Sequence, residues 1–533
     1  MASWILAPHT LRGDGMTNSP DAAREYHRLT SYRTGFQTPD DPRKNIEWAG
    51  PMKEPRPPQF KTYEGGERLP LPRDLAALGI SAVDALSGRA LSGAALDAAT
   101  IARILFYSAG LARRMEHDGR TVWFRHSGSA GNLFPLELYL VTRALDGLAA
   151  GVYQYDVLEH ALVALRSADH RGSVARALAD DAAASAYIII TGIPWRTTWK
   201  YQDRGFRHIY WDAGTMLGQL LTLAGAQAVT TPQVRLGFVD EELRELVGAD
   251  GIDEFPIAVV ALGRSERAPE SPALGDVPRG LLSPDLKRFP ITSLAQESGA
   301  LADAEQVRAW RAAAQRADAF AAPIPSEGSP PSSEVSLERA IRIRGSTRRF
   351  ARGTAPAALL RWGLAASARP IEGDFVAQGR TWIEHFVLVH DADGIAPGTY
   401  RFFAGSLALM LPGDVRAIAA ELCCEQALAS DGAFTVFHAT DVDRVTEALG
   451  SRGYRAPLLE AGIVEGRLHL AAAALGLGAS GLTFYDQETN AYFGELDAML
   501  VTAIGKPAYR PRLGGTPGRP THLHGLPAPI VAQ

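Results

Sequence analysis

The feature that most constrains the fold of this chain is an internal repeat within its 533 residues. Residues 146–153 return as residues 393–400, with aspartate, glycine and tyrosine at equivalent positions in both segments. Residues 204–226 return as residues 452–474 at nearly the same distance along the chain. Self-similarity at a constant spacing indicates a duplicated structural unit. Two related domains are therefore expected, as the length of the chain also suggests.

The two copies differ at one ionisable pair. The first copy has Lys200 and Tyr201 shortly before the sequence Arg-Gly-Phe-Arg at residues 204–207. The second copy keeps the arginines and the glycine but has Ala448 and Leu449 in place of the pair. A repeat that keeps its framework and loses its ionisable groups predicts that the two halves have different roles, with the chemistry of this pair in the first half only.

Composition excludes several classes of protein. Hydrophobic residues make up 46% of the chain and charged residues 21%, which is typical of a globular protein. A net charge of −5 without a long basic run argues against a nucleic-acid partner. Apolar runs such as residues 470–478 are too short to span a membrane, and residues 1–15 lack the pattern of a secretory signal. Cytoplasmic localisation is the simplest expectation.

The two cysteines of the chain, Cys423 and Cys424, are adjacent. Neighbouring cysteines rarely form a structural disulfide, and two thiols alone do not complete a structural zinc site. Four histidines, His126, His208, His522 and His524, show no metal-ligand pattern with acidic residues or with these cysteines. No metal site is predicted.

Each repeat has the rhythm of an α+β domain, in which apolar runs between turn residues predict strands and longer runs predict helices. The predicted strands are residues 136–142, 257–262, 383–390 and 499–504, and the predicted helices are residues 210–228, 304–319 and 457–475. The first and last of these helices carry a face of small residues, formed by Gly214, Gly218, Gly225, Gly462 and Gly466. Such a face permits close helix packing or the approach of a ligand.

The domain boundaries follow from these elements and from Pro- and Ser-rich sequence at residues 323–333. The expected units are an extended N-terminal arm (1–75), a first domain (76–265), a linker (266–334), a second domain (335–515) and a C-terminal tail (516–533). Each domain is expected to hold an antiparallel-rich mixed sheet flanked by helices.

Five motifs occur in order along the chain and carry a family resemblance. They are residues 26–30 (YHRLT), 127–137 (SGSAGNLFPLE), 200–207 (KYQDRGFR), 344–350 (RGSTRRF) and 475–481 (LGLGASG). Together they resemble the SagB-type dehydrogenase branch of the nitroreductase superfamily over about residues 20–515. The resemblance implies two tandem nitroreductase-like domains that form an internal pseudo-dimer.

The resemblance also implies FMN as the cofactor, bound at a two-fold interface with contacts from both halves. The second half has the Arg-x-Ser-x-Arg element implied to hold the phosphate, and the first half has the Ser-rich segment implied to contact the flavin or its ribityl chain. Each half lacks the other's element, so one complete composite site and one FMN per chain are predicted. The predicted FMN-binding residues are Arg344, Ser346, Arg348, Ser127, Ser129, Asn132, Gly478, Ser480 and Gly481.

Chemistry supports these assignments, although each has a structural alternative. Arginine presents a planar fork of donors that matches phosphate oxygens. The alternative for Arg344 and Arg348 is a solvated basic turn, and the alternative for the Ser-rich segment is a turn before a strand. Small residues near Gly478 permit close approach of a flavin, whereas Gly476 fits equally well as a helix cap. Arg204 and Arg207 are expected to be structural, because both persist in the second copy.

Lys200 and Tyr201 are the predicted catalytic residues. Oxidation of a C–N or C–C single bond needs a hydride acceptor, for which FMN is suited, and a base for the accompanying proton. A desolvated lysine has a lowered pKa and can serve as that base. Adjacent side chains point apart on a strand, so a loop is expected to carry the pair. A surface lysine beside a packing tyrosine is the alternative.

The resemblance implies an FMN-dependent dehydrogenase that oxidises azoline heterocycles, or similar bonds in peptides and small heterocyclic metabolites, to aromatic products. Two alternatives stay open: an NAD(P)H-dependent nitro or quinone reductase, and a non-catalytic scaffold that binds a peptide or a partner. A cyclodehydratase partner and a higher homo-oligomer also stay open, and the substrate is not defined by the sequence.

Overall fold

The computed structural model describes residues 19–34, 55–91, 95–117, 119–227, 231–323, 330–494 and 496–525. Residues 1–15, the predicted end of a helix at residue 228 and most of the Pro- and Ser-rich segment therefore lie outside the described residues. Within the described ranges, no helix is long and apolar enough to cross a membrane.

The first half of the chain forms a seven-stranded antiparallel sheet. Its strand order is β10 (Gln233–Arg235), β11 (Phe255–Leu262), β9 (Ala186–Gly192), β5 (Leu136–Thr142), β6 (Gly151–Asp156), β7 (Ala161–Ser167) and β2 (Arg68–Pro70). The central strands β5 and β9 are buried along their whole length, because helices and chain segments cover both faces of the sheet. The strands predicted at residues 136–142 and 257–262 are confirmed.

The second half repeats this sheet. Its strand order is β15 (Phe350–Ala351), β22 (Asp497–Pro507), β20 (Phe434–Thr440), β17 (Glu384–Val389), β18 (Gly398–Phe403) and β19 (Ser406–Pro412), and β21 (Gly478–Leu482) also pairs with β22. β17, β18 and β22 correspond to β5, β6 and β11 of the first sheet, so the repeat seen in the sequence is a repeat of structure. The pairs in both large sheets are antiparallel.

Helices surround the two sheets. They are α2 (Ala82–Leu86), α3 (Ala98–Ala109), α4 (Arg171–Ala177), α5 (Pro194–Tyr201), α6 (Gly205–Ala226), α7 (Asp240–Val247), α8 (Pro290–Glu297), α9 (Ala304–Arg316), α10 (Leu337–Ile343), α11 (Leu364–Ser367), α12 (Arg416–Leu422), α13 (Ala427–Asp431), α14 (Val442–Gly453), α15 (Arg455–Ala474) and α16 (Asp486–Phe493). Local signals set their starts: Asp97, Ser336 and Asp441 accept hydrogen bonds from the first turns of α3, α10 and α14. Minor strands complete the fold: β1 (Thr62–Glu64), β3 (Leu111–His117), β4 (Arg120–Arg125), β8 (Ala182–Ala183), β12 (Glu266–Arg267), β13 (Arg279–Leu281), β14 (Phe320–Ala321), β16 (Arg380–Thr381) and β23 (Thr521–Leu523).

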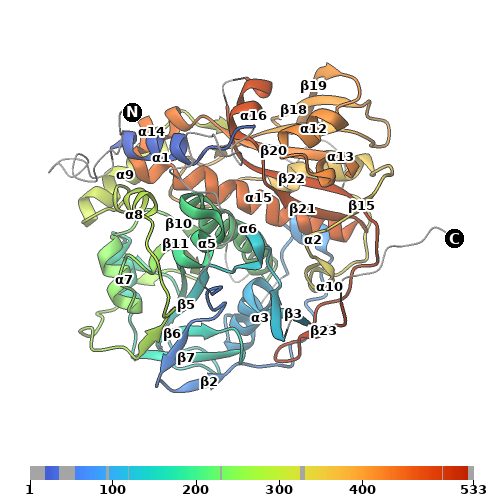
Figure 1. Cartoon of the computed structure of the whole chain (residues 1–533). Coiled ribbons are helices and arrows are strands. Elements are labelled where there is room, and N and C mark those ends of the chain that lie inside the picture. Colours follow the sequence, from blue (N-terminus) through green and yellow to red (C-terminus); the bar gives the residue numbers. More distant parts are fainter. Residues whose placement is uncertain are drawn as a thin grey trace.

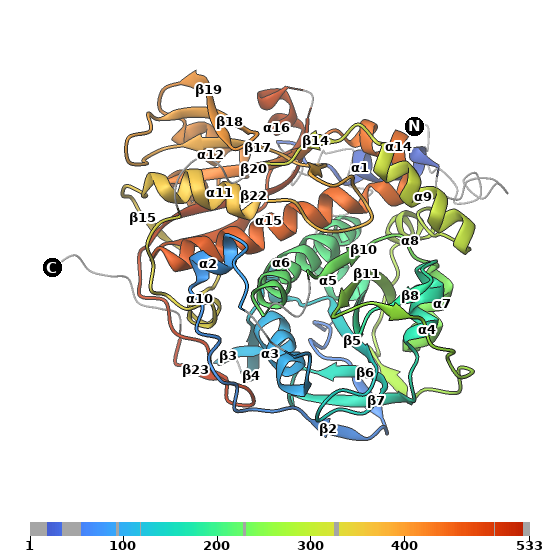
Figure 2. The same ribbon diagram turned by 180° about the vertical axis from the view of Figure 1, so that it is seen from behind.

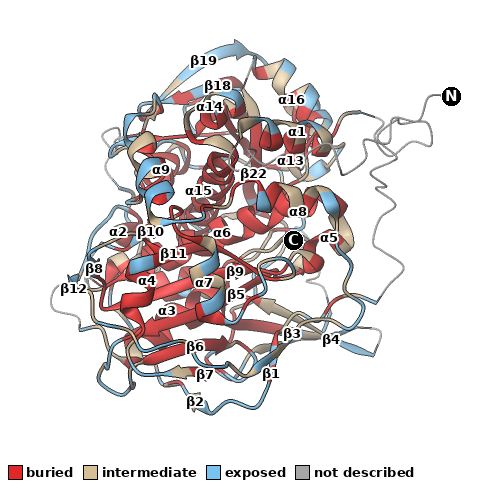
Figure 3. Cartoon of the chain, turned by 90° about the vertical axis from the view of Figure 1, so that its left-hand side faces the viewer, coloured by how far each residue is buried: buried red, intermediate tan, exposed pale blue. Residues whose placement is uncertain are grey.

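The long helices α6 and α15 pack against each other between the two sheets (Figure 1; Figure 3). Glycines make this contact possible. A Cβ added at Gly462 would lie 2.4 Å from the carbonyl oxygen of Trp211, and one at Gly214 would lie 2.2 Å from that of Leu459. The predicted small-residue face is therefore a helix–helix contact, but Gly225 lies outside it, with no atom within 4 Å of an added Cβ.

Each half exchanges segments with the other (Figure 2). Helix α2 of the first half lies in a hydrophobic core shared with α10 and α15 of the second half. The last described strand, β23, pairs in parallel with β3 of the first half. Residues 521–523 are thus part of a sheet, whereas the sequence predicted only a tail there.

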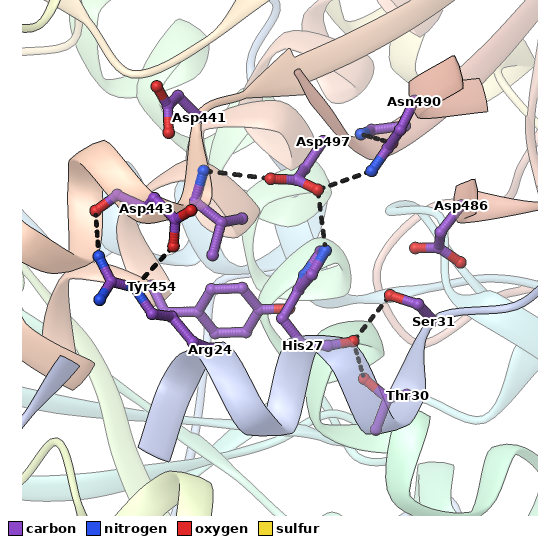
Figure 4. Close-up of polar contacts among 12 residues, drawn as sticks. Arg24, His27, Thr30, Ser31, Asp441, Asp443, Tyr454, Asp486, Asn490 and Asp497 are labelled. Atoms are coloured by element: carbon purple, nitrogen blue, oxygen red, sulfur yellow. Dashed lines mark hydrogen bonds and ion pairs between the residues drawn. The ribbon is translucent and has the colours of Figure 1, made fainter. Parts of the chain in front are cut away.

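The N-terminal arm contains a helix, α1 (Pro20–Thr30), where an extended segment was expected. Ser19 caps the helix and Pro20 occupies its first turn, a combination that starts helices. The helix is anchored on the second half through His27, whose imidazole lies 3.0 Å from the Tyr454 hydroxyl and 3.3 Å from Asp497 (Figure 4). Burial lowers the pKa of His27.

Candidate functional site

Two adjoining cavities lie between the halves of the chain, with volumes of about 450 Å³ and 390 Å³. Each is within the range of small-molecule sites. We call the first the lysine cavity, because Lys200 lines it, and the second the arginine cavity. The lining residues that they share are Gly128, Ser129, Asn132, Ser346, Arg348 and His469. Because the shared residues come from both halves, the two cavities form one composite site.

The arginine cavity is strongly cationic. It is lined by Arg113, Arg125, Arg339, Arg344, Arg348 and Arg512, and no carboxylate is among the described residues that line it. Several of these arginines are held by carbonyl oxygens: the guanidinium of Arg113, for example, donates to Arg342 and Arg512. An anionic group is the ligand that such a cavity favours.

Arg344 is a deeply buried donor of this cavity that lacks a full set of partners. Its side chain is 5% exposed, and its Nε donates to the carbonyl of His126 at 2.7 Å. Its Nη1 is buried with no hydrogen-bond partner among the described residues. Burial is the main cause that lowers the pKa of Arg344 to about 9, so the group stays charged at neutral pH. A buried charged donor without a partner points to a ligand.

Ser346 and Arg348 lie beside Arg344, and both line the two cavities. The chain reaches this position because the Thr347 amide donates to the carbonyl of Ala479 at 2.9 Å, which ties the segment to β21. The Arg348 side chain is exposed, and its amide donates to the Tyr509 hydroxyl at 3.0 Å. All three residues of the predicted Arg-x-Ser-x-Arg element are therefore brought to one site.

The Ser-rich segment of the first half meets this element across the cavity. Ser127 lines the arginine cavity, and Ser129 and Asn132 line both. Ser129 Oγ donates to Asp212 at 2.5 Å and accepts from the amide of Phe134. Asn132 Nδ2 donates to the carbonyl of Trp123 at 2.9 Å. The side chains of Ser129 and Asn132 are thus used to shape the segment.

The glycines near the end of the second repeat have a packing role as well. Gly478 lines the arginine cavity and Gly481 the lysine cavity. An added Cβ would lie 2.1 Å from Thr347 Oγ1 at Gly478 and 2.3 Å from Glu465 Oε1 at Gly481. Ser480, which was also predicted to bind FMN, lines neither cavity, and its side chain is buried in the fold.

Lys200 and Tyr201 lie in the last turn of helix α5, where a loop was predicted. The helix ends there because Gln202 adopts a positive φ of 51°. Both side chains line the lysine cavity, with Lys200 Nζ 5.2 Å from the centroid of the Tyr201 ring. Burial, followed by the charges of Arg348 and Arg56, lowers the pKa of Lys200. The Tyr201 and His208 rings lie against each other with centroids 3.8 Å apart and planes tilted by 35°, and burial raises the pKa of Tyr201.

Two buried carboxyl groups of the lysine cavity were not predicted from the sequence. Asp212 on α6 accepts from Ser129 Oγ and from the Ala130 amide, and burial is the main cause that raises its pKa to about 8. Glu465 on α15 accepts from Thr215 Oγ1 at 3.1 Å and lies 3.5 Å from His469 Nε2. The repeat aligned Asp212 with Glu460, an acidic match that was a usable signal.

Arg204 and Arg207 both have the structural contacts that the sequence predicted, but Arg204 also lines the lysine cavity. Both arginines pair with Asp486, at 2.7 Å and 2.6 Å, and this joins the start of α6 to α16. Arg204 also lines the lysine cavity, whereas Arg207 is fully buried outside it. The sequence could not separate them, because both arginines recur in the second copy.

The place equivalent to this site in the other half is occupied by the linker helix α9. Trp310 Nε1 donates to the carbonyl of Leu449, the residue that aligns with Tyr201. Arg311 pairs with Asp374 at 2.9 Å and donates to the carbonyl of Gly237. Protein side chains thus pack where the second half lacks the Lys-Tyr pair. Among the residues that the structure describes, no group of acidic residues, histidines and cysteines is arranged to hold a metal ion.

Known proteins share this fold. A solved structure from Anabaena variabilis, described as a nitroreductase, matches 91% of this chain and 99% of its own length with a TM-score of 0.65 and 24% identity. A likeness at this identity shows the nitroreductase fold. A chain of the Escherichia coli microcin synthetase McbBCD complex, with truncated pro-MccB17 bound, matches 46% of this chain and 93% of its own length at 18% identity. Its TM-score of 0.27 supports no conclusion about function.

Sequence comparison gives the family. The nitroreductase family model matches residues 87–264. A protein of Methanocaldococcus jannaschii named as a nitroreductase is 31% identical over 144 residues, which cover 26% of this chain and 71% of that protein. Members of this family are typically flavin-dependent oxidoreductases. The chain therefore belongs to the nitroreductase family.

Proposed function

We propose that the protein is an FMN-dependent dehydrogenase of the SagB type, with one FMN in the composite site. The residues present fit this cofactor. In the arginine cavity, Arg344, Ser346 and Arg348 would hold the phosphate, and the unpartnered Nη1 of Arg344 is the observation that carries the proposal. The carboxylate-free lining of this cavity supports a phosphate further. The division into the domains 76–265 and 335–515 is part of the same proposal.

The reaction we propose is oxidation of an azoline-type heterocycle to an aromatic azole. When bound, oxidised flavin supplies the two-electron acceptor for such a reaction. Lys200 accepts the substrate proton at Nζ, and its lowered pKa increases the neutral fraction that can do so. Tyr201 keeps its proton, because burial raises its pKa, and donates a hydrogen bond that orients the substrate. Asp212 holds the Ser129 segment against the site.

One FMN per chain is expected from the arrangement of the two halves. Trp310 and Arg311 of helix α9 pack in the place equivalent to the composite site. That place also has Leu449 where the composite site has Tyr201. A second flavin would need α9 to move away from it.

The flavin content of the purified protein tests the proposal, with the wild type compared to Arg344→Ala and Lys200→Ala. We expect about one FMN per chain in the wild type, less in Arg344→Ala, and full content in Lys200→Ala. Lys200→Ala is expected to lower the rate of azoline oxidation by about 10²–10⁴-fold, measured as loss of two hydrogen atoms by mass spectrometry. Two FMN per chain would contradict the composite site. A protein that stays colourless after addition of FMN would refute the proposal.

The alternative function is that of an NAD(P)H-dependent reductase, and the same purified protein can be used to test it. Anaerobic mixing with NADPH is expected to leave the flavin oxidised. Rapid bleaching of the flavin bands would instead assign the protein to the NAD(P)H-dependent nitro or quinone reductases.

A further inference from the structure

Arg204, which lines the lysine cavity, has a guanidinium edge without hydrogen-bond partners among the described residues. One edge of its guanidinium is occupied: Nη1 donates to Asp486 Oδ2 at 2.7 Å and to the carbonyl of Thr30 at 2.6 Å. The other edge, formed by Nε and Nη2, is buried and has no hydrogen-bond partner among the described residues. The side chain is only 2% exposed and lines the cavity that contains Lys200.

The guanidinium of Arg204 is also fixed in orientation. Its carbon lies 4.1 Å from the centroid of the Tyr32 ring and 5.2 Å from that of Phe484. Rings on its faces and acceptors on one edge leave the Nε–Nη2 edge as the part free to bind a ligand. Two parallel N–H donors in a rigid fork match a carboxylate, and either of them matches a carbonyl oxygen.

The second copy of the repeat provides an internal control. Arg452 is equivalent to Arg204, and all three of its side-chain nitrogens donate: Nε to the carbonyl of Leu236 at 2.6 Å, Nη1 to Asp240 at 2.7 Å, and Nη2 to the carbonyl of Phe238 at 3.5 Å. Arg452 lines neither cavity of the composite site. The open edge therefore occurs in the copy that kept the lysine and tyrosine.

We propose that the Nε–Nη2 edge of Arg204 binds an acyl oxygen of the substrate, on the carbon that loses its proton to Lys200. The substrate class is then a heterocycle that carries a carboxylate or carboxamide next to the oxidised bond. This inference rests on the proposed dehydrogenase function and names the substrate class of the same site.

The chemistry of that step balances. The proton of the carbon next to the acyl group passes to neutral Lys200 Nζ, and its C–H electron pair spreads onto the acyl oxygen. That pair would become the new ring double bond as the neighbouring ring carbon gives up a hydride, for which oxidised FMN, when bound, would supply the two-electron acceptor. Molecular oxygen is the terminal oxidant. A preorganised donor at the acyl oxygen, where negative charge develops, stabilises the transition state.

Binding of three thiazole probes to the FMN-loaded protein tests the inference by calorimetry. The probes are thiazole-4-carboxamide, thiazole-4-carboxylate and 4-ethylthiazole, which lacks the acyl oxygen. The wild type is expected to bind at least one acyl probe about tenfold or more tightly than 4-ethylthiazole, as a charged hydrogen bond allows. Comparison of the two acyl probes shows whether the site prefers a carboxamide, as in a peptide, or a free carboxylate.

The matched variants are Arg204→Lys and Arg207→Lys, since both residues pair with Asp486 and only Arg204 lines the cavity. Arg207→Lys is expected to keep the preference for acyl probes, and Arg204→Lys to lose it. Binding of the probes to the wild-type protein is a test that does not depend on any variant. If the wild type binds all three probes with equal affinity, or binds none of them, the inference is overturned. Loss of FMN from Arg204→Lys with the preference intact would assign the edge to the cofactor and also overturn it.

Activity separates this inference from the proposed function. A protein that prefers acyl probes through Arg204 but oxidises no azoline supports the acyl site and refutes the dehydrogenase. Oxidation of azolines with and without the acyl group at equal kcat/KM supports the dehydrogenase and overturns the acyl site.

Discussion

The substitution Arg344→Ala tests the composite site most directly. It removes a buried guanidinium whose Nη1 has no partner among the described residues and whose Nε donates to the carbonyl of His126. A hydrogen bond from a charged donor contributes about 1.5–3 kcal/mol, and every 1.4 kcal/mol changes a dissociation constant tenfold. The loss of one such bond to the FMN phosphate is therefore expected to weaken FMN binding by about 10–150-fold.

The assay is titration of flavin-free protein with FMN, followed by quenching of flavin fluorescence. Arg349→Ala is the matched control, because Arg349 is an exposed arginine of the same segment that lines neither cavity. Its affinity for FMN is expected to equal that of the wild type. Thermal melting of both variants without FMN shows whether the lost bond to His126 alone lowers stability.

A result within about threefold of the wild type for Arg344→Ala would refute this reasoning, because a threefold change is less than one hydrogen bond supplies. Equal weakening by Arg344→Ala and Arg349→Ala would also count against it. Such an outcome would replace a specific clamp by general attraction between FMN and a basic surface.

Two further predictions concern the helices that form the site. Gly462→Ala places a Cβ 2.4 Å from the carbonyl of Trp211 and is expected to lower the free energy of unfolding in urea by about 3 kcal/mol or more. Gly225→Ala has open space around it and is expected to change that free energy by no more than about 1 kcal/mol. Equal effects of the two substitutions would contradict the close contact between α6 and α15. Burial raises the pKa of Asp212 to about 8 in the folded protein, so this group favours the folded state most at low pH and that advantage is lost as the pH rises from about 4 to 8. Asp212→Asn is therefore expected to gain stability relative to the wild type by up to about 1.4 kcal/mol per pH unit in that window, and a difference in melting temperature that does not vary between pH 5 and 9 would count against this.

Much of the fold could be predicted, because its signals are local. The strand at residues 136–142 and the linker helix that begins at Ala304 follow from apolar runs and caps, and both agree with the structure. Helix α6 begins at Gly205, five residues earlier than predicted, because the segment 205–209 continues the buried helix directly from the motif. The helix in the N-terminal arm was missed, because prolines and charges dominate its surroundings in the sequence.

The repeat and its divergence are what the sequence by itself determined. Duplication implies two similar folds. The first half lacks a counterpart of Arg344 and the second half lacks a counterpart of Lys200, and this difference predicts that the second half supplies the phosphate-binding arginine and the first half the catalytic lysine. Residue identities suffice for this inference, since equivalent positions in a repeat occupy equivalent positions in the fold.

Only the tertiary structure decided how these groups are used. Asp212 and Arg204 are ordinary members of the repeat in sequence. Packing nevertheless buries the Asp212 carboxyl beside Ser129 and leaves one edge of the Arg204 guanidinium, at the lining of the cavity, without a partner among the described residues. The sequence likewise placed helix α9 in the linker, whereas in the structure the helix packs in the place equivalent to the composite site in the other half. Burial and partner geometry arise from contacts between residues far apart in the chain, and no local pattern encodes them.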